Sequence, residues 1–102
     1  MSEWQRICGV DDIPRLGARV VRCASGDVAV FRNADDEVFA LDDRCPHKGG
    51  PLSQGIVHGK HVTCPLHSWK ICLEDGHAAA PDEGCAQRYT VKVEDGQVYL
   101  RL

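Results

Sequence analysis

The dipeptide Asp95-Gly96, set between two alternating segments, restricts the fold of this chain more than any other feature. Residues 88–94 and 97–102 each place apolar side chains at every second position, which is the period of a β-strand with one buried face. An Asp-Gly pair between such segments predicts a tight hairpin, because both central residues of that turn require positive φ. The C-terminal end of the chain is therefore expected to form two antiparallel strands.

Further short strands, separated by turn signals, are expected along the rest of the chain. Apolar and β-branched residues predict them at 18–23, 28–32, 38–41, 56–58, 61–64 and 71–73. One helical turn is expected at residues 10–13, since Pro14 ends the pattern there. The chain has 102 residues, 43% of them hydrophobic, which suffices for one domain over residues 1–102. These features predict an all-β fold, an antiparallel sandwich or barrel.

The charge and the cysteine content of the chain indicate which partners it can bind and which cellular compartment suits it. The chain has 12 Lys and Arg against 15 Asp and Glu, a formal charge of −3, which argues against nucleic acid or a membrane as its partner. Residues 1–6 contain no export signal, and no apolar run approaches the roughly 20 residues of a membrane helix. We therefore expect a cytoplasmic protein, in whose reducing surroundings the six cysteines favour a metal or catalytic site over disulfides.

The segment 44–69 interrupts the strand pattern and contains four of the five histidines. Within it lie two motifs, Cys45-Pro46-His47 and Cys64-Pro65-Leu66-His67, with sixteen residues between them. Each motif supplies one thiolate and one imidazole, whereas a structural zinc finger usually takes two like ligands from each element. Mixed pairs suit a binuclear site of the Rieske [2Fe–2S] type, in which two His replace two Cys on one iron. Mononuclear zinc bound by the same four side chains is the alternative.

Around these residues the chain resembles the Rieske family, and in particular the small subunit of assimilatory NAD(P)H-dependent nitrite reductase. The resemblance rests on residues 45–55, 64–69 and 81–85, and the last run, Pro-Asp-Glu-Gly-Cys, is typical of that subunit. It implies a cluster-binding subdomain at about residues 43–72, formed by two loops. It also implies an iron–sulfur ligand set with two cysteines on the inner iron and two histidines on the outer: Cys45, Cys64, His47 and His67. The residues expected to surround the cluster are Lys48, Gly49, Gly50, Leu66, Ser68 and Trp69.

The same resemblance implies an electron-transfer subunit of an oxidoreductase, without catalytic residues of its own. In that family a large partner subunit carries FAD, sirohaem and a [4Fe–4S] cluster and reduces nitrite to ammonium. The present chain has no G-x-G-x-x-G dinucleotide fingerprint, so it is not expected to perform the full reaction alone. Two alternatives stay open: a stand-alone Rieske-type ferredoxin that donates electrons to an oxygenase, and a purely structural or regulatory subunit.

Three positions predict a low reduction potential. High-potential members of the family carry an extra Cys in each cluster loop, where this chain has Gly50 and Leu66. They also carry a Ser that bonds to the cluster at the position of Trp69. Fewer hydrogen bonds to the sulfurs stabilise the reduced cluster less, so we expect a potential of about −150 mV, at the low end of the Rieske range.

The remaining histidines and cysteines lack paired ligand spacing, and no second metal site is expected among them. The histidines are expected at the surface or in turns: His58, His61 and His77. The cysteines are expected to pack as small buried thiols: Cys8, Cys23, Cys72 and Cys85.

Overall fold

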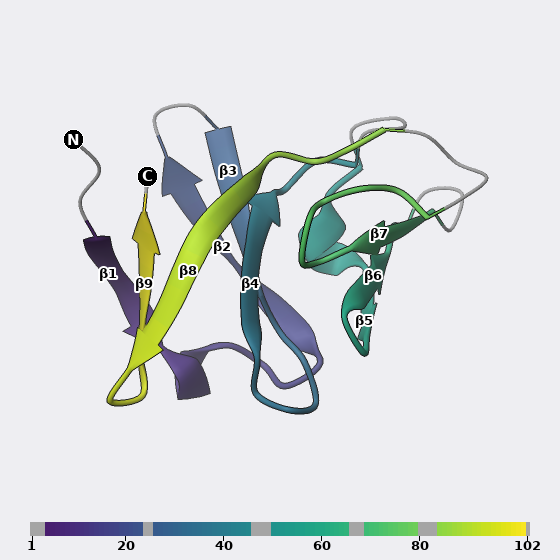
Figure 1. Cartoon of the computed structure of the whole chain (residues 1–102). Coiled ribbons are helices and arrows are strands. Elements are labelled where there is room, and N and C mark those ends of the chain that lie inside the picture. Colours follow the sequence, from purple (N-terminus) through teal and green to yellow (C-terminus); the bar gives the residue numbers. More distant parts are fainter. Residues whose placement is uncertain (1–3, 24–25, 46–49, 66–68, 80–83, 102) are drawn as a thin grey trace.

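Short strands dominate the computed structural model, which describes residues 4–23, 26–45, 50–65, 69–79 and 84–101 (Figure 1). Within those ranges the elements, with η for a 3-10 helix, are β1 (Trp4–Gly9), η1 (Val10–Asp12), β2 (Gly17–Cys23), β3 (Gly26–Arg32), β4 (Val38–Asp42), η2 (Leu52–Gln54), β5 (Ile56–His58), β6 (His61–Thr63), β7 (Lys70–Cys72), β8 (Arg88–Glu94) and β9 (Gln97–Arg101). The strands expected from the sequence and the helical turn before Pro14 are confirmed. The short helix η2 has no counterpart in the sequence-based prediction.

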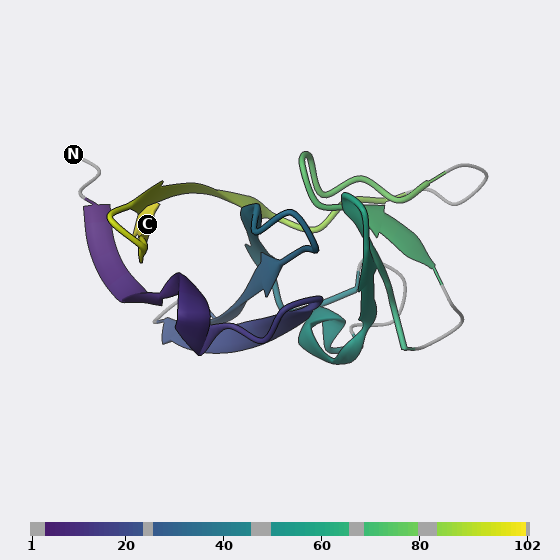
Figure 2. The same cartoon turned by 90° about the horizontal axis from the view of Figure 1, so that it is seen from below.

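Six antiparallel strands form the larger sheet, in the order β1-β9-β8-β4-β3-β2. Its β8–β9 hairpin turns at Asp95 and Gly96, whose φ angles of 50° and 73° are both positive, as predicted for this turn. Figure 2 shows the sheet curled on itself, with β8 and β9 on one side and β2 and β3 on the other. The curled interior holds the buried side chains of Cys8, Ile13, Val28, Val30, Ala40, Val98 and Leu100.

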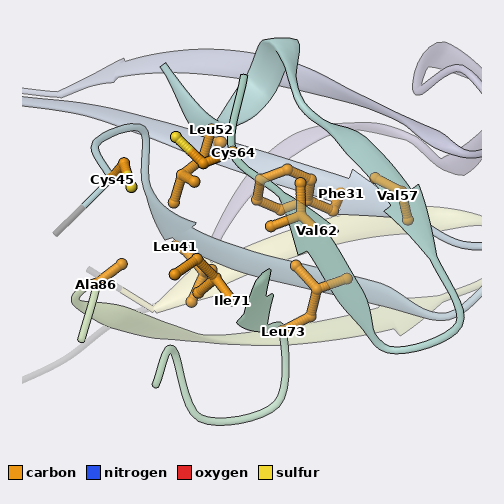
Figure 3. Close-up of a cluster of buried hydrophobic side chains, with 11 residues drawn as sticks. Phe31, Leu41, Cys45, Leu52, Val57, Val62, Cys64, Ile71, Leu73 and Ala86 are labelled. Atoms are coloured by element: carbon orange, nitrogen blue, oxygen red, sulfur yellow. The ribbon is translucent and has the colours of Figure 1, made fainter. Parts of the chain in front are cut away.

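The smaller sheet consists of β5, β6 and β7 in that order, with three residues in each strand. Its residues Val57, Val62 and Ile71 are paired across the strands and buried. They pack in one cluster with Phe31 and Leu41 of β3 and β4 (Figure 3). Alternate residues of β3 therefore face the two cores, and its four central residues are all buried.

The buried side chain of Asn33, 1% exposed, connects the two sheets. Its Nδ2 donates to the carbonyl oxygen of Gly59 in the β5–β6 turn at 3.0 Å and to Oε1 of Glu37 at 2.9 Å. Its Oδ1 accepts the N–H groups of Asp35 at 3.0 Å and Glu37 at 2.9 Å. One amide thus shapes the turn between β3 and β4 and attaches the smaller sheet to it.

This arrangement confirms the all-β, antiparallel fold class. In the part of the chain that the structure describes, no helix is long and apolar enough to cross a membrane. The limits of a cluster-binding subdomain, about residues 43–72, stay a prediction; the smaller sheet lies inside them.

Candidate metal centre

The first candidate loop begins where β4 leaves the larger sheet. The N–H of Cys45 donates to the carbonyl oxygen of Gly50 at 2.7 Å, which closes a loop over residues 45–50. The carboxylate of Asp43 holds the segment that follows, since its two oxygens accept the N–H of Ser53 at 2.7 Å and the Ser53 hydroxyl at 2.9 Å. Both ends of the loop are therefore fixed by hydrogen bonds within the protein.

The second candidate loop connects β6 to β7 and is closed in the same way. The N–H of Cys64 donates to the carbonyl oxygen of Trp69 at 2.7 Å, so residues 64–69 form a loop of the same length as the first. Gly55, which follows η2, lies close to the residue before this loop, because a Cβ on Gly55 would collide with the carbonyl oxygen of Thr63. The same closure therefore occurs twice, at the two positions where the sequence carries a Cys–His motif.

Both thiols lie away from solvent in one buried cluster. Cys45 is 2% and Cys64 is 1% exposed, and Figure 3 shows them at the end of the cluster away from Val57. Leu52 lies beside Cys64 in that view, and the half-buried Trp69 packs against the cluster. Cysteine sulfurs are the usual protein ligands of iron–sulfur clusters. Two buried thiols on closed loops therefore fit the sulfur ligands of an iron–sulfur cluster.

Four of the ten residues that we expect at the cluster lie in the described ranges, namely Cys45, Gly50, Cys64 and Trp69. The other six lie outside the described residues: His47, Lys48, Gly49, Leu66, His67 and Ser68. The structure thus brings the two cysteines together, while the full ligand set and its surroundings stay a prediction.

The remaining cysteines differ in burial more than the sequence suggested. Cys8 is buried as expected, and burial raises the pKa of its thiol. Cys23 and Cys72 are half-buried, and Cys85 is exposed, so the expectation of a buried thiol is wrong for Cys85. It lies outside both cores and joins the structure by an isolated bridge to His77. These four thiols, and that of Cys45, are free of disulfides.

The strand register aligns several imidazoles and thiols in one row, although they are irregularly spaced in the sequence. His58 pairs with His61, which pairs with Cys72, and the N–H of Cys72 donates to the carbonyl oxygen of His77 at 2.8 Å. His77 pairs in turn with Cys85. Paired residues of antiparallel strands project to the same face, so His58, His61 and Cys72 share the face opposite the buried row.

The contacts of this row do not arrange its side chains as a group of metal ligands. The rings of His58 and His61 stack with their centroids 6.1 Å apart, and Nε2 of His58 is 2.7 Å from Oγ1 of Thr63. Among the described residues, no three His, Cys, Asp or Glu side chains form a group that could hold a metal ion. The Gly59-Lys60 turn is the sequence signal for the first pair, His58 with His61, because a two-residue turn sets the register of the strands beside it. The pairing of His61 with Cys72 has no such local signal, since residues 64–69 separate β6 from β7.

Comparisons with known proteins identify the family of this chain. The family model of the Rieske [2Fe-2S] domain matches residues 3–94. The 3-phenylpropionate/cinnamic acid dioxygenase ferredoxin subunit of Photorhabdus laumondii subsp. laumondii is 38% identical over 98 residues, which cover 94% of this chain and 91% of the relative.

Two solved structures extend the comparison to the fold. The NirD protein of E. coli is 31% identical, with a TM-score of 0.85, and the match covers 99% of this chain and 97% of NirD. A protein provisionally assigned as the small subunit of an NADPH nitrite reductase is 29% identical, with a TM-score of 0.84 and coverage of 96% and 97%. Since the family model spans most of the chain and both candidate loops, this protein belongs to the Rieske [2Fe–2S] domain family.

Proposed function

We propose that this chain is the Rieske electron-transfer subunit of an assimilatory NAD(P)H-dependent nitrite reductase in the cytoplasm. The observation that carries the proposal is the pair of closed loops at residues 45–50 and 64–69, each with one Cys and one His in its sequence. In this proposal the chain supports the reduction of nitrite to ammonium. The full reaction belongs to a large subunit with FAD, sirohaem and a [4Fe–4S] cluster.

A bound Rieske cluster accepts and releases one electron at a time. The thiolates of Cys45 and Cys64 would hold such a cluster, and the imidazoles of His47 and His67 would complete its ligand set. The loop closures at both cysteines fix the positions from which their Sγ atoms project. Water is excluded from the buried side by the apolar cluster around Leu52, which lowers the local dielectric. The residues proposed to surround the cluster are Lys48, Gly49, Gly50, Leu66, Ser68 and Trp69.

Two observations support the nitrite reductase assignment. The matches to NirD and to the provisionally assigned small subunit extend over nearly the whole chain. The run at residues 81–85 is, by resemblance, typical of that subunit and not of Rieske ferredoxins in general. A chain of this size without a dinucleotide fingerprint needs a partner for hydride transfer and for the reduction of nitrite.

A second candidate function is a stand-alone Rieske-type ferredoxin that donates electrons to an oxygenase. The specific observation in its favour is the 38% identity to the dioxygenase ferredoxin subunit of Photorhabdus. Both candidates use the same cluster and the same two loops, and they differ in the partner that the chain must contact.

The deciding experiment combines the purified chain with each partner in turn. The chain should show the visible and electron paramagnetic resonance spectra of a Rieske cluster, with two irons and two acid-labile sulfides per chain. With the nitrite reductase large subunit it should form a stable complex that oxidises NAD(P)H in the presence of nitrite. A chain that stays monomeric beside the large subunit and reduces an oxygenase instead would establish the second candidate. A colourless chain that binds zinc would contradict both.

The reduction potential gives an independent measurement on the cluster itself. Gly50, Leu66 and Trp69 replace the residues that raise the potential in high-potential Rieske proteins. Redox titration should therefore give a midpoint potential of about −150 mV, and a clearly positive potential would contradict this explanation.

A further inference from the structure

The outer face of β1, β9 and β8 gathers aromatic and basic side chains. Strand register aligns Arg6 with Tyr99 and Tyr99 with Lys92, and in the next row it aligns Trp4 with Arg101. These five residues project away from the curled interior, because Val98 and Leu100 occupy the buried positions between them on β9. We call this set the basic aromatic face.

Cation–π contacts hold the positive charges of this face in place. Nζ of Lys92 lies 4.7 Å from the ring centre of Trp4 and 5.3 Å from that of Tyr99, and the guanidinium of Arg101 lies 5.2 Å from the Trp4 ring. Arg6 is held by its Nε, which donates to Oε1 of Gln97 at 2.7 Å. Three cations are therefore ordered before any partner arrives, which reduces the entropy that binding must overcome.

The charge of this face is opposite to that of the rest of the chain. Among the described residues, one carboxylate is paired with these three cations: Oε1 of Glu94 lies 3.5 Å from Nζ of Lys92. The formal side-chain charge of the face together with Glu94 is therefore +2. The rest of the chain then has nine basic and fourteen acidic side chains, a formal charge of −5. An acidic surface is attracted to this face and repelled by most of the remainder, which selects one orientation on approach.

The face also lies far from the smaller sheet. Figures 1 and 2 both place β1 and β9 at the end of the molecule opposite the smaller sheet, and the longest dimension of the molecule is 38 Å. A protein bound to β1 and β9 leaves the smaller sheet at the opposite end uncovered. This geometry suits a subunit that is anchored at one end and exchanges electrons at the other.

We propose that the basic aromatic face is the anchoring surface through which this chain docks on an acidic protein surface of its redox partner. The inference rests on the proposed electron-transfer function and adds the surface that holds the complex together. A protein partner fits better than a nucleic acid or an anionic membrane, because the formal charge of −5 elsewhere repels an extended polyanion. Half-buried Trp4 and Tyr99 also provide the aromatic contact area typical of protein interfaces.

The test uses the full chain with its cluster, the nitrite reductase large subunit, and the charge reversals Lys92→Glu and Arg101→Glu. Each reversal should raise the dissociation constant at low ionic strength about tenfold or more, and added salt should weaken the wild-type complex. The visible spectrum of the cluster should not change. Lys92→Gln, which removes the charge without adding a carboxylate beside Glu94, should show a smaller shift in the same direction.

Two matched controls place charge reversals on other exposed strands. Arg22→Glu on β2 should leave the complex unchanged, and so should Lys70→Glu on β7 of the smaller sheet. If Lys70→Glu weakens the complex and Lys92→Glu does not, the partner docks at the loop end and the inference is wrong while the proposed function stands. If the wild-type chain does not bind the large subunit at all, the proposed function fails first.

A partner-independent measurement separates a protein surface from a polyanion. Wild-type chain should not bind phosphatidylserine vesicles or single-stranded DNA at physiological salt. Binding to either that is lost in Lys92→Glu would assign the face to an anionic polymer or membrane and overturn the proposal.

Discussion

The two sheets of this molecule obtain their stability in different ways. The larger sheet has strands of five to seven residues and encloses a core of its own, which includes Ile13 and Leu100. The smaller sheet has strands of only three residues, and its buried face packs against side chains that β3 and β4 supply. Three such strands bury too little surface to be stable alone, so the smaller sheet depends on the larger one and on the loops between its strands.

The two cysteines proposed as cluster ligands lie in the region that depends on both sheets. Both cysteines belong to the core that the two sheets share, and one of them lies in the loop between β6 and β7. Metal ligands that hold two loops together stabilise the folded state, because binding to the native arrangement shifts the equilibrium away from local opening. The cluster is therefore expected to stabilise the smaller sheet more than the larger one.

The largest difference between the two sheets is expected when one of the proposed sulfur ligands is replaced. Cys64→Ser should abolish the visible absorption and the paramagnetic signal of the cluster, and with them electron transfer. In hydrogen exchange, amides of β5–β7 should lose protection while those of β9 and β3 keep most of theirs. Cys85→Ser makes the same chemical change at an exposed position and should retain the cluster. Equal loss of protection in both sheets would show that they unfold as one unit.

Removing one leucine from each core measures the two regions on the same scale. Leu52 and Leu100 are both fully buried, one in each core. Each Leu→Ala change should lower the free energy of unfolding by about 2–5 kcal/mol, because it removes buried methyl groups and leaves a cavity.

The two variants should differ in where protection is lost. Leu52→Ala should weaken hydrogen-exchange protection in β5–β7 and reduce cluster retention, whereas Leu100→Ala should weaken β1, β8 and β9 first. Identical exchange patterns for the two variants would contradict the separation into two cores.

The connection between the sheets can be weakened at a single amide. Asn33→Ala removes the donor to the carbonyl oxygen of Gly59 and the acceptor of two backbone N–H groups. Because these groups are left without their partner, we expect a loss of about 1–3 kcal/mol in the free energy of unfolding. Urea denaturation measures the loss, and Gln87→Ala at an exposed position should cost far less. If Asn33→Ala lowers the free energy of unfolding no more than the control does, the Asn33 amide does not stabilise the connection between the sheets.

Local sequence patterns predicted the strands because each strand ends at a turn that the sequence marks. The Asp95-Gly96 turn and the Gly59-Lys60 turn are examples. The expected range 61–64 exceeds β6 by one residue at its end, and the expected range 71–73 is shifted by one residue from β7. Alternation along a strand reports burial of one face, which holds for Val98 and Leu100. The sequence also placed a Cys–His motif in each of the two loops that the structure closes.

The pairing of residues that are distant in the sequence could not be predicted from local patterns. The exposure of Cys85 and the row from His58 to Cys72 depend on which strands become neighbours, and short three-residue strands carry almost no register information of their own. The role of Asn33 depends on a contact 26 residues away at Gly59. The ligand role of His47 and His67 stays a prediction from motif and resemblance.

The smallest expected effect concerns the exposed turn after β7. The N–H of His77 donates to Oδ1 of Asp75 at 2.9 Å, and this hydrogen bond holds the pKa of the Asp75 carboxyl below its ordinary value of 3.8. A lowered pKa in the folded state means that the ionised carboxylate adds stability at neutral pH, and this contribution is lost as pH falls through the folded-state pKa. Since Asp75 is exposed, solvent screening keeps the effect below about 1 kcal/mol.

Asp75→Asn keeps an oxygen acceptor for His77 and removes only the charge. The free energy of unfolding of the wild type should exceed that of the variant slightly at neutral pH, and the difference should shrink as pH falls below 3.8. Parallel urea denaturation of the two proteins across this range measures it. A difference that grows in acid would mean that the carboxylate destabilises the turn. Because the exposed Asp75 belongs to neither core, neither outcome should alter protection in β1 or β9.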